Sequence, residues 1–365
     1  MGFPEHVLSR RLSAIPADSA VDAAAMQDAR GRSIVVLGKP TETNGALVAA
    51  LHRLGHEARL AHVAETRIDG DELVLARLDV LSTLDGIEPG LEHLSRLERR
   101  GIQVLNRPSA LFAAHDKLST ALFLGRLRVP QPRTVHVRDV TVPSLEPPYV
   151  VKPRFGSWGQ EVHLCHDKDQ LRTVLARLRE QRWFRRHGAL VQSVVVPTGR
   201  DLRVVVAAGH VVGSIERRAP VGEWRTNVSL GATRLPVAAS APARALALRA
   251  VAALGVDLAG VDIAGQEPGG LRVLEVNGAV DFTPEYGPGV FDDAARALLR
   301  RAALRETQRS RRHAERVRAT DEDDRSVAVV SPRATASRVE LEPVDDLVER
   351  PALRAKRHPD EVELV

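Results

Sequence analysis

Short apolar runs alternate with helical segments over residues 32–106, and glycines close the helical segments. The strand-length runs are 34–37, 58–63, 72–75 and 102–105, and the helical segments are 44–54 and 90–100. Strands that alternate with helices predict a small α/β unit built on a parallel sheet. The turn Gly38-Lys39-Pro40-Thr41-Glu42 departs from the Gly-x-Gly-x-x-Gly pattern, so we predict no dinucleotide site at this point.

The pattern after residue 106 mixes helices with strand pairs. We predict helices at 108–127, 168–185, 241–254 and 291–304, strands at 149–153, 162–164 and 190–196, a hairpin over 200–206 and 210–218, and a strand pair over 261–263 and 271–276. The fold class is therefore α/β (α+β). We expect five segments: an N-terminal extension (1–31), an α/β domain (32–106), a central subdomain (107–189), a C-terminal subdomain (190–305) and a charged tail (306–365).

The composition is that of a globular chain, since apolar residues make up 44% of the 365 residues. The single cysteine, Cys165, excludes a disulfide framework and a cysteine-based zinc site, and we expect a packed strand thiol. No apolar run approaches the ~20 residues that span a bilayer. Residues 1–19 carry charges and lack the apolar core of a secretory signal. We therefore expect a cytoplasmic protein without a membrane partner.

Charge dominates the chain from about Glu306 onward. Arginines crowd residues 309–318, and the acidic run 321–324 follows them. Such a segment predicts a disordered or loosely helical tail. The arginine cluster also fits nucleic-acid binding, but a solvated tail is the favoured interpretation.

Three oxygen-bearing side chains lie in two neighbouring apolar runs near the end of the globular region. Glu275 and Asn277 are two residues apart, so in a strand they point to the same face. Asp262 ends the run before them. Such oxygens, converging from paired strands, suit Mg²⁺, which takes its remaining oxygens from water and phosphate. The pattern therefore indicates nucleotide chemistry, with the polar edge of a half-buried strand as the alternative.

Two lysines and a glycine-bearing turn indicate a site for phosphate. Lys152 ends an apolar strand, where an ammonium is costly unless an anion neutralises it, and Lys117 lies in the predicted 108–127 helix. The turn Gly156-Ser157-Trp158-Gly159 follows Lys152, and its backbone amides can approach phosphates closely. The alternatives are snorkelling lysines and an ordinary hairpin turn.

The order of these residues resembles that of the ATP-grasp superfamily, and more narrowly that of the RimK-type carboxylate–amine ligases. The matching motifs, over about 34–304, are Asp116-Lys117, Val151-Lys152-Pro153, Gly156-Ser157-Trp158-Gly159, Leu190-Val191-Gln192-Ser193, Asp201-Leu202-Arg203, Arg217, Asn227, Asp262 and Leu274-Glu275-Val276-Asn277. The group includes α-L-glutamate ligases and a lysine-biosynthesis ligase that works on a carrier protein. The Gly-Ser-Trp-Gly loop and Thr226-Asn227 are similar to the latter branch. The resemblance implies an ATP-grasp fold, in which two α+β subdomains clasp ATP behind an N-terminal α/β domain.

The resemblance implies a role for each matched residue. Strand 190–195 would read adenine through its backbone, and 156–162 would close over the phosphates. The implied ATP-binding residues are Lys117, Lys152, Gly156, Ser157, Trp158, Gly159, Gln192, Ser193, Val194, Val195 and Asp201. Arg203 and Arg217 would stabilise the transferring phosphoryl group, with Asn227 nearby. Asp262, Glu275 and Asn277 would hold one or two Mg²⁺ ions, or Mn²⁺.

The implied activity is ADP-forming ligation of a carboxylate to an amine through an acyl phosphate. The implied partners are ATP, an amino acid such as glutamate or another carboxylate, an amine acceptor that includes an acidic carrier protein or peptide, and further copies of the chain. Two departures bear on substrate choice: Ser193 replaces an expected acidic residue, and residues 278–285 differ from the small Ser/Pro/Gly stretch of glutamate ligases. We expect 278–285 to face the acceptor. The alternatives are a nucleotide-binding module without turnover and a nucleic-acid-binding protein that uses the arginine-rich tail.

Overall fold

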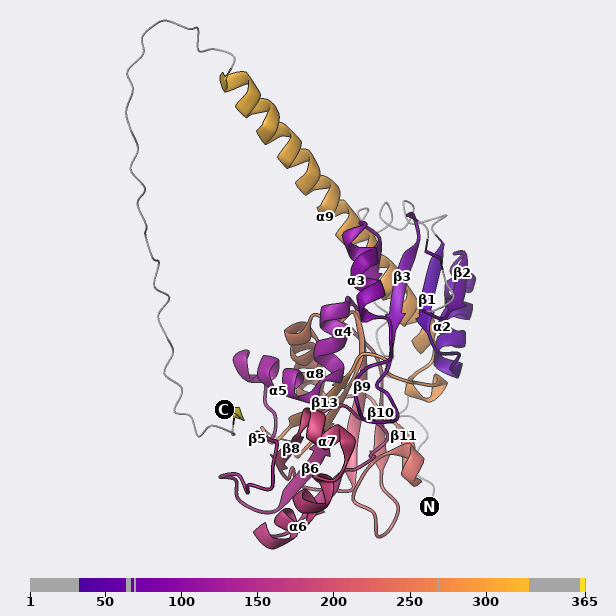
Figure 1. The fold of residues 1–365 in the computed structure, drawn as a ribbon. Helices are drawn as coiled ribbons and strands as arrows, with labels where there is room; N and C mark the ends of the chain where they lie inside the picture. The colour runs from indigo at the N-terminus through magenta and orange to yellow at the C-terminus, as the bar shows by residue number, and fades with distance from the viewer. Residues whose placement is uncertain (1–32, 64–66, 69, 268, 328–361, 365) are drawn as a thin grey trace, which may run out of the picture. The chain divides into compact units, whose positions relative to one another are not determined.

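The computed structural model describes residues 33–63, 67–68, 70–267, 269–327 and 362–364, with the backbone alone for 312–327 and 362–364 (Figure 1). Described residues as far as Ala303, together with the C-terminal strand, form one compact unit, and those from Leu304 to 327 belong to a second. Within the described ranges no helix has the length and apolar character needed to cross a bilayer. The predicted extension 1–31 lies outside the described residues.

The first domain is a four-stranded parallel sheet with helices between its strands (Figure 1). Its elements are β1 (Ile34–Gly38), α2 (Glu42–Arg53), β2 (Ala58–Ala61), β3 (Leu73–Arg77), α3 (Leu91–Arg99) and β4 (Gln103–Leu105), with strand order β2-β1-β3-β4. The predicted parallel α/β unit is confirmed. Helix α2 begins two residues before the predicted start because the Thr41 side chain accepts a hydrogen bond from the Asn44 N–H and caps it.

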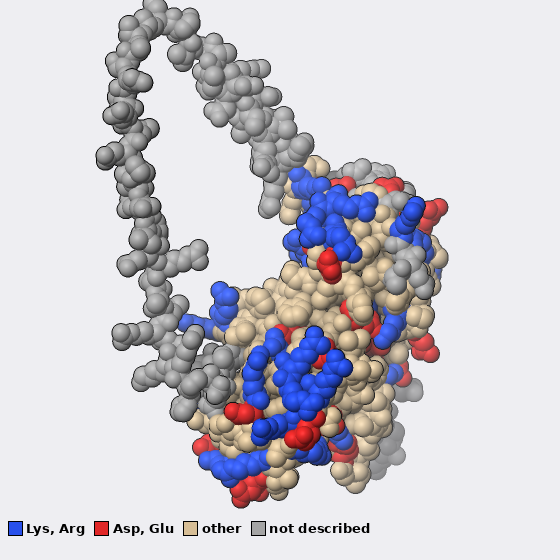
Figure 2. Space-filling view, viewed as in Figure 1, with Lys and Arg blue, Asp and Glu red and all other residues tan. Residues whose placement is uncertain are grey.

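The central sheet has strand order β14-β5-β8-β6-β7 and antiparallel pairing throughout. Its elements are β5 (Thr134–Val137), β6 (Tyr149–Pro153), β7 (His163–Cys165), α6 (Lys168–Leu178), α7 (Arg182–His187), β8 (Ala189–Ser193) and β14 (Val362–Leu364). Cys165 is fully buried in this sheet's core, and burial raises the pKa of its thiol to about 11. The predicted packed thiol is therefore confirmed. Lys and Arg side chains gather over α7 on the face shown in Figure 2, where Arg182, Arg185 and Arg186 are exposed.

The C-terminal sheet is antiparallel, with strand order β11-β10-β9-β12-β13. Its strands are β9 (Arg200–Ala207), β10 (His210–Arg218), β11 (Thr233–Pro236), β12 (Leu258–Ala264) and β13 (Arg272–Asn277). Helix α8 (Ala241–Leu254) packs on one face, beside α4 (Pro108–His115) and α5 (Lys117–Arg126). The single-turn helices η1 (Val228–Leu230) and η2 (Pro284–Tyr286) lie in the connections.

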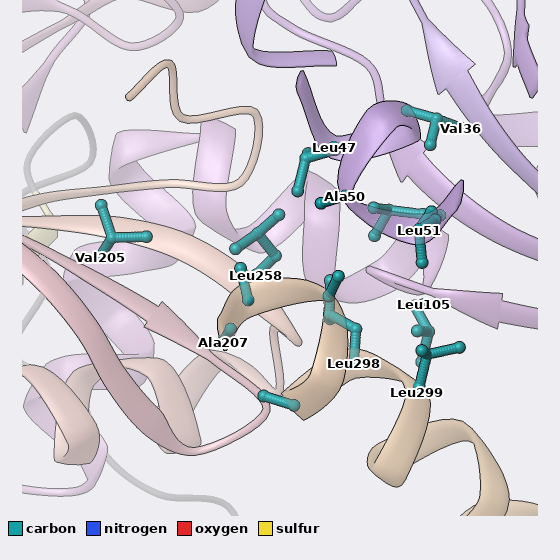
Figure 3. Packing of buried hydrophobic residues seen from close by; sticks show 14 of the residues in the cluster. Val36, Leu47, Ala50, Leu51, Leu105, Val205, Ala207, Leu258, Leu298 and Leu299 are labelled. Carbon is teal, nitrogen blue, oxygen red and sulfur yellow. The ribbon is translucent and has the colours of Figure 1, made fainter. Parts of the chain in front are cut away.

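The first turns of the last helix, α9 (Val290–Val327), join the N-terminal domain to the C-terminal sheet. Leu298 and Leu299 pack in one buried cluster with Leu51 of α2, and Ala207 and Leu258 of the C-terminal sheet belong to the same cluster (Figure 3). These two parts of the chain therefore share a hydrophobic core, whereas the central sheet has a core of its own.

Three boundaries differ from the predicted ones. β8 pairs with β5 and β6, so the central subdomain ends after Ser193 rather than at residue 189. α4 and α5 pack on the C-terminal sheet, so they do not belong to the central subdomain. The last helix runs past its predicted end at residue 304 to Val327, so residues 306–327 take the helical alternative predicted for the tail, while 328–361 lie outside the described residues.

Two predicted helices are each divided in the structure. The helix predicted over 108–127 breaks at Asp116, whose backbone is extended and whose side chain caps α5 at the Leu118 N–H. Arg154 explains the break, because its Nε and Nη2 donate to the two carboxylate oxygens of the fully buried Asp116 at 2.6 and 2.7 Å. The helix predicted over 168–185 is interrupted between Leu178 and Arg182.

Candidate active site

A cleft of about 160 Å³ opens between the central and C-terminal sheets. Most of the predicted site residues line it: Lys117, Lys152, Gly156, Ser157, Trp158, Gly159, Gln192, Ser193, Val194, Val195, Asp201, Arg217, Asn227, Asp262 and Glu275. Arg203 and Asn277 are not part of the lining. Residues spread over 159 positions of sequence are thus brought to one cavity, because β6, β8, β9, β10, β12 and β13 all present side chains to it.

Lys152 is an ammonium in a nearly dry environment. Lys152 is the second-last residue of β6 and is only 7% exposed. Its Nζ donates to the Leu274 carbonyl at 3.2 Å. No carboxylate lies within 4 Å of Nζ in the described part of the chain. Burial, with the charge of Lys117 adding to it, lowers the pKa of Lys152 to about 8. An anion in the cleft would remove this destabilisation.

Lys117 enters the cleft from the opposite subdomain. It is the first residue of α5, which Asp116 caps. Its Nζ donates to the Gly156 carbonyl at 2.5 Å and lies 3.5 Å from Oε2 of Glu275. Lys117 therefore connects the glycine-bearing turn to the carboxylate of β13.

The turn Gly156–Gly159 has its carbonyl oxygens occupied by protein donors. Ser229 Oγ donates to the Trp158 carbonyl at 3.1 Å, and an Arg225 Nη1 donates to that of Gly159 at 3.2 Å. The N–H groups of residues 157–159 have no protein acceptor among the described residues. Unpaired amides that line a cleft suit phosphate oxygens.

Gly159 is required by this geometry. Its φ is +73°, and a Cβ at this position would lie 2.6 Å from Oδ1 of Asn227. Trp158 also has a positive φ, +61°, which is unfavourable for a residue with a side chain. Its side chain is nevertheless half exposed. Non-glycine residues in this conformation concentrate at ligand-binding sites.

Four charged side chains alternate along the C-terminal sheet. Arg217 donates to Asp201 at 2.8 Å and to Asp262 at 2.8 Å, and Arg203 donates to both oxygens of Asp262 at 2.7 Å. Burial opposes ionisation of Asp262, but the two guanidinium groups outweigh burial and hold its pKa well below the usual range. Arg203 therefore contacts Asp262 rather than the open cleft, and its contact with a phosphoryl group stays a prediction.

The three predicted metal ligands lie on one face of the β12–β13 pair. Asp262 stands opposite Glu275, and Gly260 stands opposite Asn277. Among the described residues Glu275 forms an ion pair only with Lys117, while Oδ1 of Asn277 accepts from the Ala279 N–H at 2.9 Å. No group of three or more His, Cys, Asp or Glu side chains in the ranges that the structure describes is placed to hold a metal ion by itself. Two carboxylates and an amide oxygen on one strand pair fit Mg²⁺ that is completed by phosphate and water.

In the strand predicted to contact adenine, both polar side chains form hydrogen bonds with neighbouring protein groups. Gln192 is buried, and its Nε2 donates to Thr134 Oγ1 at 2.8 Å. The Oγ of Ser193 accepts from the Arg133 N–H at 3.1 Å. The substitution of an acidic residue by Ser193 therefore affects a contact with the backbone of Arg133.

Sequence reasoning did not assign Trp224, Arg225 and Thr226 to the site, although all three line the cleft. Thr226 Oγ1 donates to Asp201 at 2.7 Å, and Arg225 contacts the glycine-bearing turn. The available signal was the charged and aromatic triplet Glu223-Trp224-Arg225 inside a Gly- and Pro-containing connection, directly before Thr226-Asn227.

The loop after Asn277 is held by the N-terminal domain. Asn106 Nδ2 donates to the Gly278 carbonyl at 2.8 Å, and Arg77 Nη2 donates to that of Val280 at 2.5 Å. Thr43 Oγ1 lies 3.1 Å from both the carbonyl and the N–H of Phe282. Residues 278–282 are therefore fixed against β3, β4 and α2.

The fold is that of solved ATP-grasp proteins. A solved structure of a RimK-domain ATP-grasp protein from Sphaerobacter thermophilus superposes with a TM-score of 0.55 at 21% identity, covering 74% of this chain and 99% of that one. More narrowly, residues 114–286 match the RimK-like ATP-grasp domain.

The chain is similar in sequence to two curated proteins that are named as ligases. The tetrahydromethanopterin:alpha-L-glutamate ligase of Methanosarcina acetivorans is 30% identical over 188 residues, which are 46% of this chain and 57% of the relative. The alpha-aminoadipate–LysW ligase LysX of Saccharolobus solfataricus is 29% identical over 195 residues, which are 52% of this chain and 69% of the relative. The chain thus spans between about half and two thirds of these relatives.

Proposed function

We propose that this protein is an ATP-dependent ligase that joins a carboxylate to an amine. The observation that carries the proposal is Lys152, a buried ammonium with no carboxylate within 4 Å among the described residues. It faces a cleft that is also lined by Lys117, Arg217 and the turn 156–159. A polyphosphate supplies an anionic partner for Lys152 and for the unpaired amides of the turn.

The reaction that we propose has two steps. A carboxylate oxygen attacks the γ-phosphorus of ATP, the bond to the β-phosphate oxygen breaks, and an acyl phosphate and ADP form. The amine then attacks the carbonyl carbon, an amide forms, the amine loses a proton, and phosphate leaves with one oxygen of the original carboxylate. Neither step needs a covalent nucleophile on the protein, which agrees with the burial of Cys165.

The residues of the cleft would act by position and charge. Lys117 and Lys152 approach from different subdomains and would hold the phosphates between them, and the free amides of 157–159 would bind phosphate oxygens. Arg217 is fixed by two carboxylates, so its charge needs no reorganisation when negative charge moves between oxygens. The strand 190–195 would contact adenine.

Asp262, Glu275 and Asn277 would hold Mg²⁺, which Mn²⁺ could replace. The chemistry that Mg²⁺ supplies when bound is neutralisation of phosphate charge. In this chain Arg203 and Arg217 keep Asp262 ionised, so one ligand is ready at any pH above the acidic range.

We propose an amino acid such as glutamate as one substrate. The support comes from the names of the two relatives, which contain glutamate in one case and alpha-aminoadipate in the other. Glutamate and alpha-aminoadipate are both amino acids with two carboxylates. The loop 278–285, which follows the last proposed metal ligand and whose first five residues are fixed by the N-terminal domain, would face the acceptor.

Labelled oxygen tests the proposal directly. The protein, ATP and Mg²⁺ are incubated with amino acids carrying ¹⁸O in their carboxyl groups and with a panel of amines, and ADP and phosphate are analysed by mass spectrometry. One ¹⁸O should appear in phosphate for each amide formed. Amide without ¹⁸O in phosphate would refute the acyl phosphate, and absence of ADP with every pair, together with no ATP binding, would refute the ligase.

A further inference from the structure

The glycine-bearing turn is held from two sides by side chains of the C-terminal subdomain. Lys117 binds the Gly156 carbonyl on one side. On the other side, Arg225 and Ser229 bind the carbonyls of Gly159 and Trp158. All three donors come from outside the central subdomain that carries the turn, so these hydrogen bonds join the turn to the C-terminal subdomain across the cleft.

Arg225 is oriented for this contact by a neighbouring carboxylate. Its Nε and Nη2 donate to the two oxygens of Glu223 at 3.0 and 2.8 Å, which leaves Nη1 to reach the Gly159 carbonyl. Glu223 also accepts from the N–H groups of Trp224 and Arg225, each at 2.9 Å. The Arg225 hydrogen bond holds the pKa of Glu223 down, at about 2, so the pair is charged throughout the physiological range.

The backbone of the turn packs closely against the C-terminal subdomain at Gly159. The virtual Cβ of Gly159 would lie 2.6 Å from Asn227 Oδ1 and 3.3 Å from Leu230 Cδ1. The carbonyls of Gly156, Trp158 and Gly159 thus accept from protein side chains, while the N–H groups of residues 157–159 have no protein acceptor in the described ranges. Each carbonyl shares its peptide plane with the N–H of the next residue, so Lys117 orients the Ser157 N–H and Ser229 orients the Gly159 N–H. Arg225 orients the Gln160 N–H, which donates to the Ser157 carbonyl at 3.2 Å and thereby sets the plane that carries the Trp158 N–H.

We propose that Arg225, oriented by Glu223, is a positioning residue that fixes the amides of residues 157–159 for the nucleotide phosphates. This inference rests on the proposed function for its ligand. It adds that the connection between β10 and β11, which carries Arg225 and Ser229, determines how firmly the backbone of the turn is held. Ser229 is a second, weaker part of the same contact.

Nucleotide binding and hydrogen exchange test this inference without catalysis. Arg225→Ala and Arg225→Lys are compared with the unaltered protein for the Kd of ATP by calorimetry and for amide exchange of residues 156–161 with ATP bound. We expect Arg225→Ala to weaken ATP binding about tenfold, the effect of one charge-assisted hydrogen bond, and to raise exchange in the turn. Arg225→Lys keeps the charge but loses the fork that holds Glu223, so it should recover only part of the affinity.

Arg218→Ala is the matched control, because Arg218 also pairs with a nearby glutamate, Glu216, but lies exposed and does not contact the turn. It should leave both readouts unchanged. Glu223→Gln provides a second route if Arg225→Ala unfolds, and it should raise exchange in the turn while the fold is retained. The inference is overturned if Arg225→Lys and Glu223→Gln both match the unaltered protein in affinity and exchange. If the proposed ligation fails while ATP still protects the turn in an Arg225-dependent way, the positioning role stands and the proposed activity falls.

Discussion

Asp262→Asn tests whether the alternating charges of the C-terminal sheet stabilise the fold. The substitution keeps the size of the side chain and removes its charge. Arg203 then loses its only carboxylate among the described residues, while Arg217 keeps Asp201. The Asp262 side chain is 9% exposed and that of Arg203 is 15% exposed, so water cannot replace the lost partner fully.

The expected loss of unfolding free energy follows from this burial. Removing one partner of a buried ion pair costs about 3–5 kcal/mol. Because Arg217 keeps a partner and asparagine can still accept one hydrogen bond, we expect the lower end, about 3 kcal/mol. With a urea dependence of about 3 kcal/mol/M for a chain of this size, the midpoint should fall by about 1 M.

Urea unfolding followed by far-ultraviolet circular dichroism measures this change. The matched control is Asp292→Asn, which breaks the more exposed pair with Arg53 and should cost less than about 1 kcal/mol. The folded-state pKa of Asp262 lies below its unfolded value, so its contribution is complete above about pH 4 and is lost as pH falls toward the folded pKa. The difference in unfolding free energy between the unaltered protein and Asp262→Asn should therefore be constant from neutral pH down to about pH 4 and shrink in stronger acid. A loss no larger than that of Asp292→Asn would refute the reasoning.

Four further predictions concern the cleft and the central core. Glu275→Gln should remove most Mg²⁺-dependent ADP formation with the circular dichroism spectrum unchanged, whereas Glu216→Gln should leave both unchanged; near-normal turnover of Glu275→Gln would show that the metal site lies elsewhere. Lys152→Met should raise the urea midpoint of the free protein at pH 7, because it removes a buried ammonium, while calorimetry shows ATP binding to be lost; unchanged affinity would count against the phosphate contact. At pH 9, above the pKa of about 8 of Lys152 in the free protein, ATP binding should take up a proton, and equal binding heats in buffers of different ionisation enthalpy would contradict this. Cys165 should resist thiol reagents at pH 8 in the folded protein and react after denaturation, so rapid labelling of the native chain would disprove its burial.

The sequence was sufficient for features that depend on local pattern. The parallel sheet followed from alternating apolar runs. Cleft residues such as Arg217 and Asn227 were implied only by the family resemblance. By contrast, Lys152, Asp262 and Glu275 followed from charged side chains placed in or at the ends of apolar runs. Lys152 is an example, because a lysine in an apolar strand is unusual enough to indicate an anion. The glycine-bearing turn was found because its composition and its position after that strand agree.

The features that were missed depend on contacts between distant residues. Asp116 sits inside a continuous helical pattern, and only its pairing with Arg154, 38 positions later, shows that the helix must break there. β8 reads as the start of a new subdomain, but its partners β5 and β6 precede it in the chain. Arg203 and Arg217 look equivalent in sequence, yet the register places Arg203 opposite Asp262 and Arg217 opposite Asp201, and of the two only Arg217 lines the cleft.

Leu84 has a consequence for how the cleft exchanges its contents. It belongs to the N-terminal domain, has a φ of +59°, and is buried in the core of the central subdomain, while its neighbour Asp85 pairs with Arg186 and His187 of α7. Any movement that swings the central subdomain away from the N-terminal domain must expose this leucine, at about 1.5–3 kcal/mol. That term alone makes the closed arrangement about 10- to 150-fold more populated than the open one. The rate at which nucleotide enters would then be set by a small open population, and shortening the side chain at position 84 would speed both entry and escape.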